Sequence, residues 1–519
     1  MTSAAGRIGA GLDVDRAARP IRPMERIHVV GAAGAGASAA TLLAAHAGAL
    51  VTACDPGGAS PYTPALEALG IVVAPEHSAA HVTQGPRPDR LAVTKALTAI
   101  DPDQAELAAA RLAGIPVEPW QQLVADAAFG RTLVGVAGTH GKSTTAGWLV
   151  HLLVAAGADP SAFVGALLPT SLTGGPPATA RWGHGDAFVV EADEYAGNFD
   201  PYHPALAIVT SAEWDHPDVF TDQASVIVAF EAWLRRASAD AIVVANVGDP
   251  GVEAVLDRLR DWSGTIIAYA LVDQTAQRLG GYARAIAERF TTAGRPTTTL
   301  LGRVTGSDRA STTIELDGLD PLVGPITTRL SSAGRHNAAN ALAAAAAASV
   351  LGLTPSAISA HLGTFEGIGR RLEWKGEAAG VVVYDDYGHH PSAIRETLAA
   401  VRQREPGRRV WAVYEPLTFH RTAAMLDQFA DVLSSADAVA IADVWAGRDL
   451  DTTITSAADL AAAIAVRRPD LRVLAPGSVE ATADQLADEV RSGDVVLVMG
   501  GGVSYRIAER LLDRLEASG

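Results

Sequence analysis

A lysine and a serine that follow two closely spaced glycines form the most chemically informative stretch of this chain. Residues 133–145 read LVGVAGTHGKSTT, in which an apolar run leads through Gly138 and Gly141 to Lys142 and Ser143. Glycines let backbone N–H groups approach phosphate oxygens, and the N-terminus of a following helix favours the same anion. The stretch therefore predicts a strand, a phosphate-binding loop and a helix, with Lys142 on the outer phosphates and Ser143 on Mg²⁺.

The loop departs from the general G-x-x-x-x-G-K-[ST] pattern, because Val136 takes the place of its first glycine. A glycine-rich turn with an exposed lysine is the alternative. The apolar run before the turn and the helical segment after it favour phosphate binding.

Acidic residues and a histidine follow two further apolar runs in the middle of the chain. The run over 187–190 leads directly into Glu191, and the run over 207–210 ends shortly before His216. Because the carboxyl ends of parallel strands converge on one crevice, Ser143, Glu191 and His216 are expected to meet around Mg²⁺ and phosphates. The alternative for His216 is a turn residue that caps the next helix.

Two asparagines open the long alanine-rich helix that is expected to end near Leu351. Asn337 and Asn340 are three residues apart, so they share one face at the start of that helix. Side-chain amides in this position can contact the edge of an adenine ring. Helix capping is the alternative, and it explains one asparagine better than two.

A third polar cluster reads DDYGHHP over residues 385–391 and follows the apolar run 381–384. His389 and His390 are adjacent, and adjacent ligands without partners seldom close a zinc site. A contact with ATP or with substrate is the preferred interpretation, and a plain surface turn is the alternative.

A second glycine-rich turn lies near the amino terminus, between two expected strands. It contains Gly31, Gly34 and Gly36, and the next strand ends at Asp55. A glycine turn with an acidic residue about twenty positions further on suits a dinucleotide or a nucleotide-sugar diphosphate. The glycines do not match G-x-G-x-x-G in register, so a turn without a ligand is the alternative.

Length and composition limit the class of protein. The chain has 519 residues, 48% of them hydrophobic, and a net charge of −17 with a pI near 5.2. This acidity argues against a nucleic-acid binder unless one face is locally basic. The single cysteine, Cys54, excludes intramolecular disulfides and metal sites built from several cysteines, and is expected to be a small core residue. The most apolar stretch, 338–353, is too short to span a bilayer. We expect a cytoplasmic protein without nucleic-acid or membrane partners.

Alternation of strands and helices predicts an α/β fold of three domains. A Rossmann-like domain is expected over residues 24–128, a central P-loop domain over 129–366 and a second Rossmann-like domain over 367–519. Residues 1–23 have no apolar segment of the kind found in signal peptides, and are expected to form a disordered tail.

The order of these motifs resembles that of the Mur ligases over nearly the whole chain after the tail. The motifs that carry the resemblance are Gly138-Thr139-His140-Gly141-Lys142-Ser143-Thr144, Glu191-Ala192-Asp193-Glu194, Asp215-His216, Gly334-Arg335-His336-Asn337 with Asn340, Gly369-Arg370-Arg371, and Asp385-Asp386-Tyr387-Gly388-His389-His390-Pro391.

The resemblance implies an enzyme of peptidoglycan precursor synthesis. It would use ATP to join L-alanine to the carboxylate of UDP-N-acetylmuramate through an acyl phosphate, as a monomer or homodimer. The first domain would bind the UDP-sugar, the second ATP, and the third would close over ATP and the amino acid.

The resemblance also implies roles for single residues. ATP would be bound by Gly138, Thr139, His140, Gly141, Lys142, Ser143, Thr144, Asn337, Asn340, Arg371, Asp386 and Tyr387. Mg²⁺ would be bound by Ser143, Glu191 and His216. Catalysis would rest on Lys142, Glu191, His216, Arg371 and His389. The UDP-sugar side would be bound by Gly31, Gly34, Gly36, Ser38, Asp55, Thr98, His389 and Arg421.

Two acceptor-side motifs depart from the family pattern. Residues 416–422 read PLTFHRT, where the family pattern is Pro-His-Arg-[Tyr/Phe]-[Ser/Thr]-Arg-Thr, so only Arg421 remains of the two arginines. Residues 97–100 read LTAI, where the family pattern is Ser-Ser-Ala-Ile. The alternatives are a recycling ligase that joins a whole peptide to the same acceptor, and a nucleotide-sugar sensor without catalytic activity.

Overall fold

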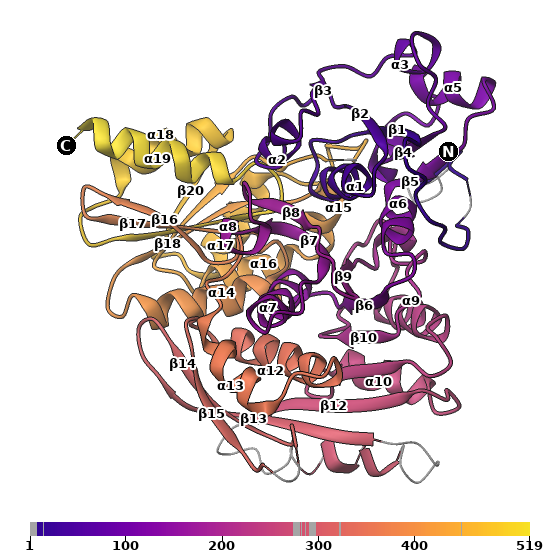
Figure 1. The fold of residues 1–519 in the computed structure, drawn as a ribbon. Coiled ribbons are helices and arrows are strands. Elements are labelled where there is room, and N and C mark those ends of the chain that lie inside the picture. Colours follow the sequence, from indigo (N-terminus) through magenta and orange to yellow (C-terminus); the bar gives the residue numbers. More distant parts are fainter. Residues whose placement is uncertain are drawn as a thin grey trace.

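Three sheets organise the described part of the chain in this computed structural model (Figure 1). In Figure 1 the first part (indigo) and the last part (yellow) lie beside each other, and the middle part lies below both. The sheets with their helices confirm the expected α/β class. The structure describes residues 8–13, 15–272, 281, 283–285, 287–289, 297–320, 323–447 and 449–518.

The first sheet is parallel, with the strand order β3-β2-β1-β4-β5. Its strands are β1 (Arg26–Val30), β2 (Leu50–Cys54), β3 (Val73–Ala74), β4 (Arg90–Val93) and β5 (Val117–Pro119). Its helices are α1 (Ala35–His46), α2 (Pro64–Ala68), α3 (Ala80–Thr83), α4 (Lys95–Ile100), α5 (Ala105–Leu112) and α6 (Trp120–Ala127). With β1 in the centre, the glycine turn after β1 lies at the carboxyl edge, where α/β folds of this kind bind ligands.

Residues 15–23 lie against this sheet, in contrast with the disordered tail expected over residues 1–23. Arg16 forms ion pairs with Glu118 at 2.6 Å and with Asp126 at 2.7 Å, and Ile21 is buried in the core. Carboxylates that a fold removes from water need a cation nearby, and this segment supplies one. Residues 1–7 and 14 of the expected tail lie outside the described residues.

The second sheet is the largest, and its strand order is β15-β14-β13-β12-β11-β10-β6-β9-β7-β8. Strands from β13 to β7 in this order are parallel, and the strands beyond them on both sides are antiparallel. The strands are β6 (Thr132–Ala137), β7 (Ser161–Leu168), β8 (Ala178–Arg181), β9 (Ala187–Ala192), β10 (Leu206–Val209), β11 (Ile242–Asn246), β12 (Thr265–Val272), β13 (Thr297–Ser307), β14 (Thr312–Asp317) and β15 (Ile326–Leu330).

Two helices of the middle part carry the loops that matter for chemistry. These are α7 (Lys142–Ala155) and α12 (Arg335–Val350), which pack against each other. The alanines of α12 are buried, and their small side chains let the two helices approach closely. The other helices are α8 (Thr170–Thr173), α9 (Gln223–Arg235), α10 (Pro250–Arg258), α13 (Pro355–His361) and the 3₁₀ turns Tyr195–Gly197 and Leu362–Thr364.

The third sheet has the order β16-β17-β21-β18-β19-β20, and all its strands except β16 are parallel. The strands are β16 (Glu373–Ala378), β17 (Val381–Asp386), β18 (Val410–Glu415), β19 (Ala438–Ala442), β20 (Arg472–Gly477) and β21 (Val495–Gly500). The helices are α14 (Pro391–Arg404), α15 (Phe419–Ala424), α16 (Leu426–Leu433), α17 (Ala457–Arg467), α18 (Val479–Glu489) and α19 (Tyr505–Ser518).

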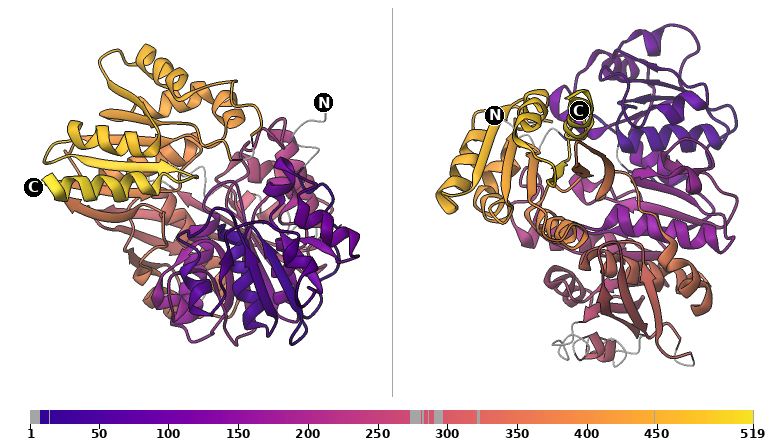
Figure 2. Two further views of the ribbon diagram at one scale, coloured as in Figure 1. Left: turned by 90° about the horizontal axis from the view of Figure 1, so that it is seen from above. Right: turned by 90° about the vertical axis from the view of Figure 1, so that its left-hand side faces the viewer.

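Helices cover both faces of the third sheet (Figure 2). One face packs on α14, α16 and α17, and the other on α18 and α19. This explains why β17, β18, β19 and β21 are buried along their whole length and read as continuous apolar runs. Within the described residues, no helix has the length and apolar character needed to cross a membrane.

Arg90 neutralises a group of buried carboxylates in the first sheet. Its side chain is 2% exposed and pairs with Glu25 at 3.2 Å, with Glu118 at 3.0 Å and with Asp126. Removing one partner from a buried ion pair leaves an uncompensated charge, which costs about 3–5 kcal/mol. Arg90→Met should therefore lower the stability of this part of the protein by about that amount. Calorimetric melting measures the effect.

The matched control is Arg26→Met, because Arg26 is exposed at the start of β1. We expect its melting curve to match the wild type. Equal melting temperatures of the two variants would mean that Arg90 is not needed to stabilise the buried carboxylates.

Candidate active site

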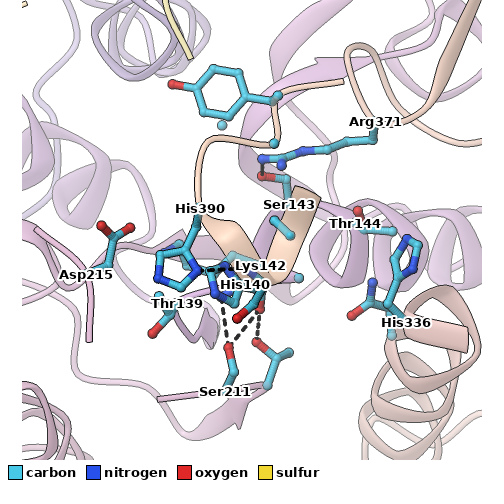
Figure 3. Close-up of a pocket in the computed structure, with 18 of the residues that line it drawn as sticks. Thr139, His140, Lys142, Ser143, Thr144, Ser211, Asp215, His336, Arg371 and His390 are labelled. Carbon is cyan, nitrogen blue, oxygen red and sulfur yellow. Dashed lines mark hydrogen bonds between the residues drawn. The ribbon is translucent and has the colours of Figure 1, made fainter. Parts of the chain in front are cut away.

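A cavity of about 850 Å³ lies where the three parts of the chain meet. Figure 3 shows part of its lining around the loop between β6 and α7. Trp120 comes from the first part, Lys142 from the second and Arg371 from the third. The cavity therefore brings together many of the expected residues, namely Gly36, Thr139, His140, Gly141, Lys142, Ser143, Thr144, Glu191, His216, Asn337, Asn340, Arg371, Asp386, Tyr387 and His389.

The loop between β6 and α7 has the strand–loop–helix form that its sequence predicts. Gly138 and Gly141 have positive φ angles of 138° and 81°. A Cβ atom on Gly138 would lie 2.1 Å from Thr210 Oγ1, and one on Gly141 would lie 2.5 Å from Asn340 Oδ1. Only glycine combines this backbone conformation with such close neighbours.

Two carboxylates hold the ammonium group of Lys142. Its Nζ donates to Glu194 Oε2 at 2.9 Å and lies 3.5 Å from Asp193 Oδ1. Burial alone would lower the pKa of Lys142, but the charges of Glu194 and Asp193 outweigh burial and raise it. Lys142 is therefore charged and placed beside the helix N-terminus, where it can exchange these carboxylates for phosphate oxygens.

Burial raises the pKa of Glu194 to about 7, with Asp193 adding to the rise and Lys142 opposing it. Two adjacent carboxylates share one lysine here, and two like charges this close do not both ionise readily. The charge on Glu194 therefore changes close to neutral pH.

A serine, a glutamate and an arginine connect the loop to the third part of the chain. Ser143 Oγ donates to Glu191 Oε1 at 3.0 Å, and Arg371 Nη2 donates to Ser143 Oγ at 2.9 Å. Figure 3 shows Arg371 reaching across to Ser143. The other oxygen of Glu191 accepts from the backbone N–H of Gly165 at 2.6 Å. A hydroxyl and a carboxylate side by side are the hard oxygen ligands that Mg²⁺ prefers, so this pair fits the ion.

His216 fits a cation less simply. Arg421 Nη2 lies 3.0 Å from His216 Nδ1, and Arg421 Nε donates to Asp215 Oδ1 at 2.6 Å. An arginine can only donate, so Nδ1 accepts and a neutral His216 carries its proton on Nε2. In this arrangement Nε2 has no lone pair for a metal. A magnesium role for His216 stays a prediction, and it requires Arg421 to release Nδ1.

Arg421 was expected to contact the substrate, but it lies outside the cavity lining, so this contact stays a prediction. It is 2% exposed and is absent from the cavity lining, because its charge neutralises the buried Asp215. Burial would raise the pKa of Asp215, but Arg421 lowers it well below its ordinary value. The sequence showed a basic residue in an acceptor-side motif, but its partner lies 206 positions away.

Two adjacent histidines at the end of β17 have different partners. His389 Nδ1 lies 2.9 Å from the carbonyl oxygen of Tyr387, so Nδ1 carries the proton and Nε2 has a free lone pair. Burial lowers the pKa of His389 well below its ordinary value, and the nearby Arg421 adds to the effect. His390 accepts from the backbone N–H of Ser392 at 3.3 Å at the start of α14, and burial followed by the nearby His140 lowers its pKa to about 4.

The asparagines of α12 both line the cavity and also fix local structure. Asn337 Nδ2 donates to the carbonyl oxygen of Ala333 at 2.8 Å, and Asn340 Oδ1 accepts from Thr145 Oγ1 at 3.3 Å. The second contact ties α12 to α7 behind the loop. A contact of either amide with adenine stays a prediction.

Tyr387 contacts the two arginines shortly before β16, and Asp386 holds the backbone that follows them. Asp386 accepts from the backbone N–H groups of Leu372 and Gly388, both at 2.7 Å. The Tyr387 ring lies 5.1 Å from the Arg371 guanidinium carbon and 5.2 Å from that of Arg370. These contacts point Arg371 toward the loop.

In the first part, only Gly36 of the expected substrate residues lines the cavity. Gly31 and Gly34 shape the turn before α1, and Asp55 Oδ2 accepts from the backbone N–H of Ala33 at 3.0 Å. Ser38 and Thr98 are both buried, and a contact of either residue with the UDP-sugar stays a prediction. Ser38 donates to the carbonyl oxygen of Tyr62 at 2.9 Å, and Thr98 to that of Lys95 at 2.8 Å.

Several cavity residues were not among the expected set, including Asp193, Glu213 and Asp215. Each stands within three residues of an expected one, in the same polar stretch after a strand. The convergence of strand ends could have identified them, because it applies to the whole stretch and not to one residue in it.

Sequence models of one family match most of the chain. Residues 26–131 match the model described as Mur ligase family, catalytic domain; residues 136–348 match the Mur ligase middle domain; and residues 370–502 match the Mur ligase, glutamate ligase domain.

Individual proteins are similar over nearly the full length. A UDP-N-acetylmuramate–L-alanine ligase from Frankia casuarinae is 37% identical over 514 residues, which cover 95% of this chain and 98% of that protein. The crystal structure of a UDP-N-acetylmuramate–alanine ligase from Thermotoga maritima has a TM-score of 0.72 at 22% identity, covering 95% of this chain and 100% of that one. A murein peptide ligase from Psychrobacter arcticus has a TM-score of 0.69 at 24% identity, covering 95% and 99%.

Glu194→Gln should reduce the pH dependence of ATP binding. Lys142 must leave Glu194 to meet a phosphate, and the pKa of about 7 leaves Glu194 mostly uncharged at pH 6 and charged at pH 8. Wild-type affinity for ATP should therefore fall about tenfold more across this range than that of E194Q. Calorimetric titration at both pH values, without acceptor, measures the difference.

Glu213→Gln is the matched control. Burial would raise the pKa of Glu213, but the hydrogen bond with His140 and the neighbouring groups lower it to about 2, so it stays charged from pH 6 to 8. E213Q should keep the wild-type pH dependence. An E194Q variant with the same pH dependence as wild type would contradict the role assigned to Glu194.

Proposed function

Because this chain belongs to the Mur ligase family, we propose that it joins L-alanine to the carboxylate of UDP-N-acetylmuramate in an ATP-dependent reaction of peptidoglycan precursor synthesis. One observation carries the proposal. Lys142, the Ser143–Glu191 pair and Arg371 from the third part meet in one cavity that the first part also lines.

The reaction needs positioning and charge neutralisation more than a covalent nucleophile. The muramyl carboxylate attacks the γ-phosphorus of ATP, the bond to the bridging oxygen breaks, and ADP leaves. The amine of L-alanine then attacks the acyl carbon, phosphate leaves, and the nitrogen loses a proton. Carboxylate and triphosphate are both anions, so the first step depends on cations that lie between them.

This chain provides cations on two sides of the loop. Lys142 would move from Glu194 and Asp193 to the outer phosphates of ATP. Arg371, already hydrogen-bonded to Ser143, would neutralise phosphate charge from the side of the third part. Ser143 and Glu191 would hold Mg²⁺, which supplies further neutralisation of the phosphates when it is bound.

His389 would accept the proton of the amine. Its Nδ1 donates to the carbonyl oxygen of Tyr387, so Nε2 keeps its lone pair. Burial lowers the pKa of His389, so the imidazole is neutral near pH 7. A neutral imidazole with a free nitrogen can receive a proton as the amide bond forms.

The three parts must stay closed while the acyl phosphate exists, because water would hydrolyse it. Contacts across the parts support a closed arrangement. Lys95 Nζ donates to the carbonyl oxygen of Ala196 at 2.9 Å, and Gln121 Nε2 donates to Asn198 Oδ1 at 2.6 Å. Arg371 adds the contact from the third part.

In this reaction residues 24–128 would bind the UDP-sugar and residues 129–366 would bind ATP. Residues 367–519 would close over ATP and the amino acid. The proposal includes Mg²⁺ as the metal, a cytoplasmic location, and a monomer or homodimer that needs neither nucleic acid nor membrane. The predicted contacts of Asn337, Asn340, Asp386 and Tyr387 with ATP belong to the same proposal.

A recycling ligase is the second candidate, because the murein peptide ligase from Psychrobacter arcticus has a similar fold. The test is phosphate release from ATP with Mg²⁺ and UDP-N-acetylmuramate, compared over L-alanine, glycine, L-serine and the recycling tripeptide. We expect release that requires both the acceptor and L-alanine. Release with the tripeptide alone would identify the recycling reaction, and ATP binding without acceptor-dependent release would identify a sensor.

Lys142→Ala should reduce acceptor-dependent phosphate release by about a thousandfold, because it removes a cation that acts on the charge developed in the transition state. Thermal melting should show that the variant remains folded. Lys375→Ala is the matched control, since Lys375 lies on β16, pairs with Glu373 and is absent from the cavity lining. Near-normal turnover of K142A would reject the assigned role of the loop.

A further inference from the structure

Three histidines, a cysteine and a glutamate form a cluster in the first part of the chain. His28 lies on β1, Cys54 at the end of β2, His77 and His81 before and within α3, and Glu106 on α5. His28 is 1% exposed, and Cys54 and Glu106 are fully buried. None of the five residues lines the cavity described above, so the proposed ligase reaction does not explain them.

Glu106 is at the centre of the cluster. Its Oε1 lies 2.7 Å from His28 Nε2 and 2.9 Å from His81 Nδ1, and its Oε2 lies 3.3 Å from Cys54 Sγ. His28 Nε2 and Cys54 Sγ are 3.4 Å apart. The four donor atoms all lie within 4.8 Å of one another, so four elements of the fold direct them at one point.

These separations are close to those around a metal ion. Tetrahedral zinc, with bonds of about 2.0–2.3 Å, holds its ligand atoms about 3.3–3.6 Å apart. The neighbouring donor atoms in the cluster lie 2.7–3.4 Å apart. Shifts of less than about 1 Å in the side chains would make room for the ion.

The types of ligand atom in the cluster favour zinc. A cysteine sulfur, imidazole nitrogens and a carboxylate oxygen are the ligands that zinc takes in proteins, whereas Mg²⁺ and Ca²⁺ take oxygen ligands. Thr52 Oγ1 lies 2.8 Å from His28 Nδ1. In the structure His28 Nε2 donates to Glu106, which can only accept. Ligation would move this proton to Nδ1, where Thr52 Oγ1 can accept it and fix the orientation of the ring.

The charge of the cluster also favours a cation. Within the described residues, the ion-pair partners of Glu106 are histidines, and no lysine or arginine pairs with it. A divalent ion bound to this buried carboxylate would supply positive charge that no lysine or arginine provides there.

We propose that His28, Cys54, His81 and Glu106 bind one zinc ion in the first part of this protein. His77 lies 3.2 Å from Cys54 Sγ through its Nδ1 and supports the sulfur from outside the ligand set. Binding forms a zinc–sulfur bond and releases the thiol proton of Cys54 to solvent. The ring protons that His28 Nε2 and His81 Nδ1 direct at Glu106 move to the other nitrogen of each ring, so that these nitrogens can ligate the ion.

The ion would connect four elements below the glycine turn. The carbonyl oxygen of Cys54 accepts from the backbone N–H groups of Gly31 at 2.9 Å and of Ala32 at 3.2 Å. Fixing Cys54 therefore fixes the start of this turn. The side chains of His77 and His81 are 15% and 20% exposed, which gives the ion a path from solvent.

Cobalt binding to the full-length protein tests the proposal. The protein is stripped with a chelator and titrated with Co²⁺, which takes zinc sites and absorbs visible light. We expect one Co²⁺ per chain with a thiolate charge-transfer band in the near ultraviolet, and loss of the band when Zn²⁺ is added. The band requires a cobalt–sulfur bond, and Cys54 is the only cysteine of the chain, so Co²⁺ in the cavity cannot produce it.

Three variants complete the test. Cys54→Ser should lose the band, and His81→Gln should bind Co²⁺ and Zn²⁺ at least about tenfold more weakly. His184→Gln is the matched control, because His184 is exposed and lies outside the cluster. Saturating Zn²⁺ should raise the melting temperature of the wild type and of H184Q by about 5 °C, and that of H81Q by less.

If Cys54→Ser fails to fold, the metal affinity of His81→Gln tests the proposal instead. His81 is partly exposed, so its replacement should leave the fold intact. Co²⁺ binding without the band would overturn the proposal. So would an H81Q variant with wild-type affinity, or a stripped protein that takes up no Co²⁺ with this band. Each of these results would mean that the five side chains form a hydrogen-bonded network around Glu106 without a metal.

Discussion

The site depends on compensation of charge that the fold removes from water at the carboxyl ends of the second sheet. Lys142 lies between Glu194 and Asp193, and Arg421 neutralises Asp215. A buried charge without a partner would be too costly to retain, so each of these groups constrains its neighbours. Lys142 and Asp193 line the cavity, so the lysine can be transferred from its carboxylates to a ligand. In the second pair Asp215 lines the cavity and Arg421 lies behind it, where Arg421 also contacts His216.

Small residues let these charged groups approach one another. Gly165 leaves space for Glu191, since a Cβ atom at this position would lie 2.9 Å from Glu191 Oε1. Gly138 does the same beside Thr210, and the alanines of α12 bring Asn340 up to the loop. The glycines and alanines around the site therefore do more than form turns and helices. They let side chains from different elements come within hydrogen-bonding distance.

Sequence patterns predicted what is local, and missed what depends on distant partners. The phosphate loop was predictable, because its glycines, its lysine and the strand before it are contiguous. The convergence of strand ends also placed Glu191 and His216 at one cavity. The contact between Arg421 and Asp215 was not predictable, because 206 positions separate them and the motif around Arg421 suggested a substrate contact. The backbone partners of Ser38 and Thr98 were not predictable either, since a hydroxyl in a ligand-binding motif looks alike whether it faces a ligand or a backbone carbonyl.

The altered acceptor-side motif has a consequence for how charge is shared. Thr418 stands where the family pattern has an arginine, and here it caps α15, while Arg421 is held by Asp215. Within the described residues, the lysine and arginine side chains that line the cavity are Lys142, Arg335, Arg371 and Arg395. An acceptor carboxylate that approaches a triphosphate in this cavity must therefore share these cations with it. When the carboxylate and the triphosphate contact the same cations, the two anions lie next to each other. This favours the arrangement in which the carboxylate oxygen faces the γ-phosphorus.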